Sequence, residues 1–172
     1  MQEFVIDVFA FCRAAESSSG STAIASLARL TNELTDTAGA LEWQLQGSVN
    51  EFGHACLDVQ VRGQLTLICQ RCLTPYVLEL DSDSRLVLVK DEETADEVEE
   101  LLDDDSIDVV VGSKAFNIID LIEDEALLAI PQSPKHTVCP DQTLVASATV
   151  IDEEAGKPDS PFAKLKQLNG RT

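Results

Sequence analysis

Apolar and polar side chains alternate with a period of two between residues 41 and 67. A β-strand points successive side chains to opposite faces of a sheet, so this alternation predicts half-buried strands. A turn that contains Gly53 divides the region in two, which predicts an antiparallel hairpin. The expected inward-facing positions are Leu41, Trp43, Leu45 and Val49 in the first strand, and Leu57, Val59, Val61, Leu65 and Leu67 in the second.

Two further apolar runs, 76–80 and 85–89, lie on either side of the polar segment 81–83. They predict another pair of strands that turns at this segment. The middle of the chain, from about residue 41 to residue 89, is therefore expected to be an antiparallel β meander of about four or more strands.

The segment 117–130 predicts the longest helix. Asn117 can cap its first turn, Asp120 follows at the spacing of a capping box, and Pro131 ends it. The expected buried stripe consists of Ile118, Ile119, Leu121, Ile122, Ala126, Leu128 and Ala129. The acidic residues 123–125 are expected to form a solvated face. A shorter helix is predicted over 21–34.

These elements predict an α+β fold, in which the meander is packed by one long and one or two short helices. A length of 172 residues suits a single domain over 1–172. We expect an N-terminal extension over 1–20. The segment 157–172, with Lys157, Lys164, Lys166 and Arg171, is the only locally basic stretch, and we expect it to be a tail.

Acidic residues dominate the composition. The chain has 31 Asp and Glu against 12 Lys and Arg, a formal net charge of −19. This balance excludes an autonomous nucleic-acid binder with a broad basic face. Eleven of the acids lie in 91–108, which has no Lys or Arg. Because like charges repel, we expect an acidic, solvated linker there. The alternative is an acidic surface that mimics RNA or docks a basic ribosomal protein.

The start of the chain does not resemble a secretory signal, and no apolar run is long enough to cross a membrane. Five cysteines, an odd number, argue against a disulfide framework in a chain of this kind. We therefore expect a reduced, cytoplasmic protein.

Cys69 and Cys72 form a C-x-x-C pair, and His136 and Cys139 form a second pair with the same spacing. Zn²⁺ prefers four soft or borderline ligands in a tetrahedron, which two short ligand pairs can supply. We expect one structural zinc ion held by these four residues. Two other interpretations stay open: reduced, packed thiols, and a redox-active pair, although a redox C-x-x-C usually begins a helix.

Nothing in the sequence indicates catalysis. It has no glycine-rich phosphate loop and no hydrolase nucleophile elbow. His54 lies in the turn that contains Gly53, where a surface histidine is the simpler explanation. We expect no catalytic residue, no enzymatic activity and no small-molecule substrate.

The order of four motifs resembles the YceD family, which is named for large ribosomal RNA subunit accumulation. The motifs are the L-x-C-Q-R-C-L-x-P run at 67–75, the acidic run, the segment from 120 to 139, and PDSPFAKLKQL at 158–168. The resemblance covers roughly residues 40–168. It implies a bacterial or plastid cytoplasmic factor that supports accumulation of large-subunit ribosomal RNA, with no enzymatic activity. Members of that family often carry Cys or His near the four candidate ligand positions.

The resemblance and the acidic charge together favour a local contact with RNA. The partner would be precursor RNA of the large subunit, a basic ribosomal protein, or both. Arg71, Lys164 and Lys166 are the candidate RNA-binding residues. The alternatives are a thiol redox protein that uses Cys69 and Cys72, and an acidic adaptor that docks a basic protein.

Overall fold

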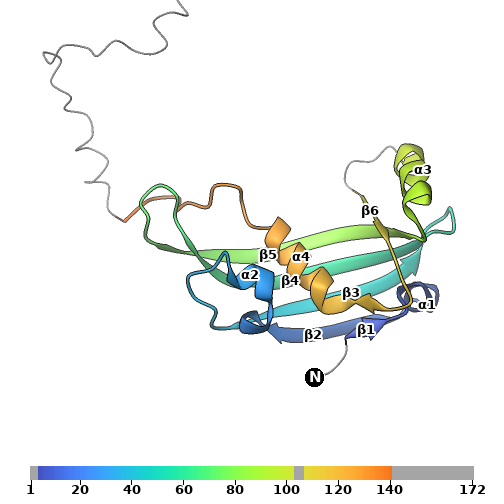
Figure 1. Cartoon of the computed structure of the whole chain (residues 1–172), viewed down its shortest axis with the longest axis horizontal. Helices are drawn as coiled ribbons and strands as arrows, with labels where there is room; N and C mark the ends of the chain where they lie inside the picture. The colour runs from blue at the N-terminus through green and yellow to red at the C-terminus, as the bar shows by residue number, and fades with distance from the viewer. Residues whose placement is uncertain (1–3, 103–106, 141–172) are drawn as a thin grey trace, which may run out of the picture. The chain divides into compact units, whose positions relative to one another are not determined.

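A computed structural model describes residues 4–102 and 107–140. Contacts divide the chain into the units 1–138 and 139–172, and every described helix and strand belongs to the first unit. The fold of this unit is α+β, as predicted. A five-stranded sheet has the order β2-β3-β4-β5-β6, and a small second sheet pairs β1 with β7 (Figure 1). None of the helices in the described ranges is long and apolar enough to cross a membrane.

The sheet is antiparallel except at one edge. Strands β2 (Ser17–Ala23), β3 (Ala40–Val49), β4 (Ala55–Ile68) and β5 (Pro75–Val89) pair with their neighbours in antiparallel register, and β6 (Asp108–Val111) runs parallel to β5. The small sheet joins β1 (Val5–Ile6) to β7 (Phe116–Asn117). The predicted hairpin is confirmed as β3 and β4, and all its predicted inward residues are buried except Val49, which is 47% exposed.

Helix α4 (Ile118–Leu128) lies across one face of the sheet (Figure 1). The side chain of Asn117 caps it by accepting a hydrogen bond from the backbone N–H of Ile119, as predicted. Its apolar side chains enter a core with the inward-facing residues of β3, β4 and β5. Leu128 was expected in the stripe but is 80% exposed.

The expected turn at 81–83 was wrong. Residues 75–89 form one continuous strand that pairs with β4 along its whole length. Ser82 and Ser84 occupy inward positions of this strand but are polar. They interrupt the apolar alternation, and the sequence pattern therefore resembles that of a turn. In the structure they lie on the side of β5 that faces α4, where the Ser82 hydroxyl donates to the Glu125 carboxylate at 3.2 Å.

The expected acidic linker also needs correction. Residues 92–102 form helix α3 (Glu92–Leu102), with the acidic side chains outward and Ala95 and Val98 buried. These two residues pack against Cys56, Val87 and Val89 on the face of the sheet opposite the main core. An amphipathic helix thus accommodates the like charges, because its apolar stripe is buried while its acids stay in water.

The N-terminal segment is part of the fold rather than an extension. Helix α1 (Val8–Arg13) buries Val8, Phe11 and Cys12, and its N-cap Asp7 accepts from the backbone N–H of Ala10. The predicted helix over 21–34 is replaced by the end of β2, the short 3₁₀ helix η1 (Ile24–Ser26) and α2 (Ala28–Thr31). The predicted tail at 157–172 lies outside the described residues, and the single domain stays a prediction.

The acidic residues of α4 also differ from the expectation of a solvated face. Glu123 and Glu125 were expected in solvent, but each is only 6% exposed. The Glu123 carboxylate accepts the backbone N–H groups of Arg29 and Leu30, at 2.6 and 3.0 Å, and the Arg29 side chain at 2.9 Å. It therefore accepts hydrogen bonds from the N–H groups in the first turn of α2, because the N-cap residue Leu27 supplies no side-chain acceptor. Glu123 joins α2 to α4.

Candidate metal centre

The four predicted ligands converge at the end of the sheet where β4 turns into β5. The sulfur atoms of Cys69, Cys72 and Cys139 and a ring nitrogen of His136 all lie within 4.8 Å of one another. Cys69 and Cys139 are buried, and the other two are half-buried. This cluster can hold a metal ion. For comparison, a tetrahedron with Zn–S bonds of 2.3 Å has edges of about 3.8 Å, so only a small contraction is needed.

The first ligand pair lies on the tight connection between β4 and β5. The backbone N–H of Cys69 donates to the carbonyl of Thr74 at 3.0 Å, and the N–H of Leu73 donates to the carbonyl of Cys69 at 2.8 Å. Leu73 has a φ of 60°, the left-handed region that favours glycine. The chain thus makes the turn after Cys72 without the glycine that this conformation prefers.

The second ligand segment is held against this turn by two hydrogen bonds and a ring contact. The N–H of Gln70 donates to the carbonyl of Pro134 at 2.9 Å. The Arg71 guanidinium donates to the carbonyl of His136 at 2.8 Å. The Tyr76 ring meets the His136 ring edge-on, with centroids 5.3 Å apart. Segments 64 residues apart, as measured from Cys72 to His136, are therefore joined in part by hydrogen bonds that use no ligand atom.

Hydrogen bonds prepare the Cys69 sulfur to carry a negative charge. Burial raises the pKa of the Cys69 thiol, but backbone N–H groups of Cys72, His136 and Arg71 and the His136 side chain lower it to about 5. The backbone N–H of His136 lies 3.4 Å from this sulfur. The thiolate, rather than the thiol, binds metal ions, so the turn favours the ligating form.

His136 is oriented by the same sulfur atoms. Its Nδ1 lies 3.5 Å from the Cys72 sulfur, which is also 3.1 Å from the Thr74 hydroxyl. The sulfur of Cys69 raises the pKa of the His136 imidazole, burial lowers it, and the sulfur of Cys72 raises it further, so that the net shift is upward. The two sulfur atoms therefore favour the charged imidazolium over the neutral ring.

The remaining cysteines differ from the cluster. Cys12 and Cys56 are buried, and burial is the main cause that raises the pKa of each thiol.

The redox alternative requires access to the Cys69 sulfur. Cys69 is fully buried, so a partner in thiol–disulfide exchange cannot reach this sulfur without opening the turn. This geometry does not favour the redox alternative, which stays an untested prediction.

The candidate RNA-binding residues are not brought together in the described part of the chain. Arg71 is exposed, but its guanidinium is engaged with the carbonyls of His136 and Thr137. Lys164 and Lys166 lie outside the described residues. The RNA-binding assignment of these three residues stays a prediction.

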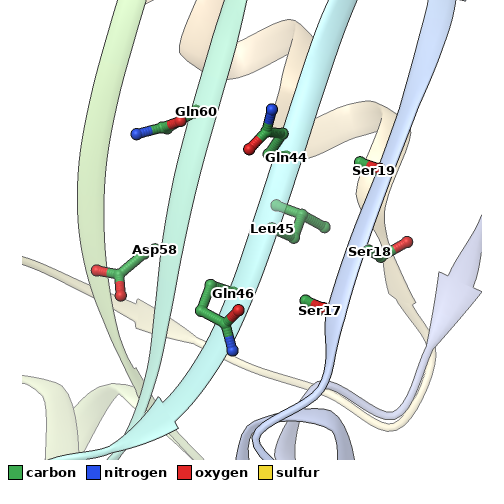
Figure 2. A pocket seen from close by; sticks show the side chains of 8 residues that line it. All are labelled: Ser17, Ser18, Ser19, Gln44, Leu45, Gln46, Asp58 and Gln60. Carbon is green, nitrogen blue, oxygen red and sulfur yellow. The ribbon is translucent and has the colours of Figure 1, made fainter.

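Besides the ligand cluster, the structure has a hollow of about 450 Å³ on the polar face of the sheet (Figure 2). Figure 2 shows that its side chains come from three neighbouring strands, β2, β3 and β4. Among its described lining residues the one acid is Asp58, whose carboxylate accepts two hydrogen bonds from Arg85. This part of the lining therefore offers no pair of titratable groups for acid–base catalysis.

Sequence reasoning missed the groups that support the ligands. Tyr76 lies in a predicted strand, and nothing in its local pattern indicates a contact with His136.

The buried acids of α4 were predictable from their spacing. Glu125 follows Ile122 by three residues and therefore lies within the apolar stripe of α4, which is a signal of burial. Glu123 had the same kind of signal, because it follows Ile119 by four residues and precedes Ala126 by three.

Comparison with known proteins places the chain in a family. The family model described as "Large ribosomal RNA subunit accumulation protein YceD" matches residues 57–169. The chain belongs to the YceD family. The match spans all four ligand positions. A relative from Haemophilus influenzae, named large ribosomal RNA subunit accumulation protein YceD, is 28% identical over 147 residues, which are 83% of this chain and 81% of the relative. No solved structure gave a significant match.

Proposed function

We propose that this protein supports accumulation of large-subunit ribosomal RNA in the cytoplasm, as a binding factor without enzymatic activity. The observation that carries the proposal is membership of the YceD family across two thirds of the chain. The expected partners are large-subunit precursor RNA, a basic ribosomal protein, or both. The described residues add a cluster of four candidate metal ligands, two on the β4–β5 turn and two on the segment after α4, and hydrogen bonds hold the turn and that segment together.

The metal in this proposal is one structural zinc ion. Three thiolates and one imidazole are the donors of many closed zinc sites, which leave no open position for a substrate. Cys69, Cys72, His136 and Cys139 would hold the ion and fix the β4–β5 turn to the segment that follows α4. Zinc bound there supplies folding energy rather than catalysis.

The proposed RNA contact includes Arg71, Lys164 and Lys166. Of these three residues only Arg71 is described, and one nitrogen of its guanidinium donates to the carbonyls of His136 and Thr137. Arg71→Lys tests whether Arg71 acts at the metal loop or at the RNA, because an ammonium keeps the positive charge but lacks the planar guanidinium that reaches these carbonyls. Metal content that falls in Arg71→Lys while RNA binding is retained would assign Arg71 to the metal loop alone.

The function itself is tested in cells. Depletion of the protein should lower the ratio of large-subunit to small-subunit ribosomal RNA, and the wild-type gene should restore it. A Cys69→Ser gene should restore it poorly, whereas Cys56→Ala, which alters a buried thiol outside the cluster, should restore it well. An unchanged ratio after depletion would contradict the proposal.

A further inference from the structure

Six of the described cations differ in whether an acidic side chain pairs with them. Arg29, Arg62 and Arg85 each form an ion pair with an acidic side chain. Arg13, Lys90 and Lys114 form no such pair among residues 4–102 and 107–140, although the protein carries a net charge of −19. All three are exposed. Arg13, Lys90 and Lys114 differ from Lys135, which also forms no ion pair within these ranges, because they line two adjoining hollows.

These three cations lie around one aromatic ring. A hollow of about 540 Å³ and an adjoining one of about 320 Å³ share the lining residues Phe9, Arg13 and Lys90. His54 also lines the first hollow, and Lys114 lines the second. We call the two hollows together the cation groove, defined by Phe9, Arg13, Lys90 and Lys114.

The groove is built by segments that are far apart in the sequence and fixed to one another. Helix α1 supplies Phe9 and Arg13, the residue after β5 is Lys90, and Lys114 follows β6. The backbone N–H of Val8 donates to the carbonyl of Ser113 at 3.3 Å, and that of Gly112 donates to the carbonyl of Val89 at 2.8 Å. The cations are therefore carried by a hydrogen-bonded framework.

Gly112 allows the aromatic ring to lie close to this framework. A Cβ atom at residue 112 would lie 2.9 Å from the Cζ atom of Phe9, closer than such contacts occur. The ring is half-buried, and the rest of it lines both hollows. Phe9 thus leaves part of its ring on the walls of both hollows instead of being enclosed in the core.

Acidic groups do not cancel the charge of the groove. Among the described residues that line the groove, Asp7 is the one carboxylate, and it caps α1. Asp91 follows Lys90 and interacts with its charge, but it is not a described lining residue and it also accepts from the hydroxyl and N–H of Thr94 at the start of α3. Three cations against one lining carboxylate leave a local excess of positive charge, which attracts an anionic ligand.

We propose that the cation groove binds a single-stranded segment of RNA, with phosphates on Arg13, Lys90 and Lys114 and a base on the ring of Phe9. Non-specific single-strand sites combine cations along the backbone with aromatic rings on which bases stack, and the groove contains both. An acidic peptide would use the cations but would leave the ring without a role. The inference rests on the proposed function for its choice of RNA as the anion.

The full-length protein can be titrated with a fluorescent single-stranded RNA of about 12 nucleotides at several salt concentrations. Each lost phosphate contact lowers the salt slope of the affinity by about 0.7. Arg13→Gln with Lys90→Gln should therefore reduce the slope by about 1.4. Between 50 and 200 mM salt, the double variant should lose about sevenfold less affinity than the wild type does.

The matched control is Arg62→Gln with Arg85→Gln. This control also removes two positive charges, but from arginines that already form ion pairs with Asp81 and Asp58 on the polar face. Its slope should equal that of the wild type. Equal slopes for the wild type and Arg13→Gln/Lys90→Gln would overturn the groove while leaving the cellular ribosomal RNA test untouched. Wild-type protein that binds an acidic peptide but no RNA would also overturn it.

The stacking contact has its own variant. Phe9→Leu keeps an apolar side chain against the core but removes the aromatic face. It should weaken RNA binding at least fivefold, with an unchanged salt slope, because stacking is not screened as phosphate contacts are. Thermal denaturation of the same variant shows whether the fold is kept. Unchanged affinity in a folded Phe9→Leu protein would overturn the role of the ring.

Discussion

Strands β4 and β5 run between two ends that are held together in different ways (Figure 1). At one end the tight β4–β5 turn, with Cys69 and Cys72, meets the segment that contains His136. At the other end β5 continues through Lys90 into α3, near α1 and the β3–β4 turn. The first end buries sulfur ligands, and the second buries Ala95 and Val98 while its cations stay exposed.

The difference shows how one sheet can separate stability from recognition. Ligand sulfurs that carry charge at neutral pH must be balanced, so the cysteine end depends on a cation or on its hydrogen bonds. The α3 end is closed by apolar side chains and backbone hydrogen bonds, which leaves Arg13 and Lys90 available to a ligand. We therefore expect metal loss to affect stability and cation loss to affect binding.

The largest expected effect is at the cysteine end. Cys69→Ser removes a buried ligand and should cost about 4 kcal/mol of unfolding free energy, because loss of a structural metal is among the most damaging single changes. Melting should fall by roughly 10 °C, and a strong chelator should lower the wild type similarly. Elemental analysis should find about one zinc per wild-type chain.

Cys56→Ala is the control for this comparison. It alters a buried thiol at the α3 end and should keep the metal. If Cys69→Ser retained full metal content, or if freshly purified wild-type protein contained none, the cysteine end would not be a metal centre.

A second effect lies between the two ends, where Glu123 joins α2 to α4. Glu123→Ala leaves the N–H groups of Arg29 and Leu30 without their acceptor and should cost about 2–3 kcal/mol. Asp124→Asn, which alters only the exposed partner of Arg29, should cost less than about 1 kcal/mol. Equal losses in urea denaturation would show that the backbone contacts contribute little.

The same residue predicts a dependence on pH. Burial raises the pKa of the Glu123 carboxyl, but the Leu30 N–H and the Arg29 side chain and N–H lower it below its ordinary value of 4.5. A folded pKa below the unfolded one adds stability that is present above about pH 4.5 and is lost as the pH falls through the folded value. The stability difference between the wild type and Glu123→Gln should therefore shrink in acid, and a constant difference would contradict this assignment.

At the α3 end the expected effect is smaller. Val98→Ala removes two methyl groups from a cluster with Val87 and Val89 and should cost about 1–2 kcal/mol without loss of metal. Glu99→Ala, on the exposed side of the same helix, should change stability by less than about 0.5 kcal/mol. If Val98→Ala had no effect, α3 would not be packed on the sheet.

The smallest effect concerns the turn after Cys72. Leu73 adopts a φ of 60° and is 74% exposed, so Leu73→Gly relieves backbone strain without removing core contacts. The greater freedom of glycine in the unfolded chain offsets part of that gain, and the net stabilisation should be below about 1 kcal/mol. A melting temperature that falls in Leu73→Gly would show that the exposed leucine makes a stabilising contact.

Local patterns were sufficient where burial follows the chain. The alternation of 41–67 predicted β3 and β4, and the stripe after Asn117 predicted α4, since each pattern reflects a single buried face. The same reasoning failed at Ser82 and Ser84, which are polar residues at inward positions. It also failed at 92–102, where two small apolar residues among many acids bury one side of α3.

The sequence by itself determined the ligand types and their pairing, because a spacing of three residues places two donors on one turn whatever the rest of the chain does. Only the tertiary structure decided that the two pairs meet. The β4–β5 turn and the segment after α4 are 64 residues apart at Cys72 and His136, and the pairing of strands and the packing of α4 bring them together. The same holds for Phe9, Arg13, Lys90 and Lys114, which are scattered along the sequence and become neighbours only through the hydrogen bonds that join α1, β5 and the residues after β6. Local spacing is set by covalent geometry, whereas long-range proximity depends on how the whole chain buries its apolar surface.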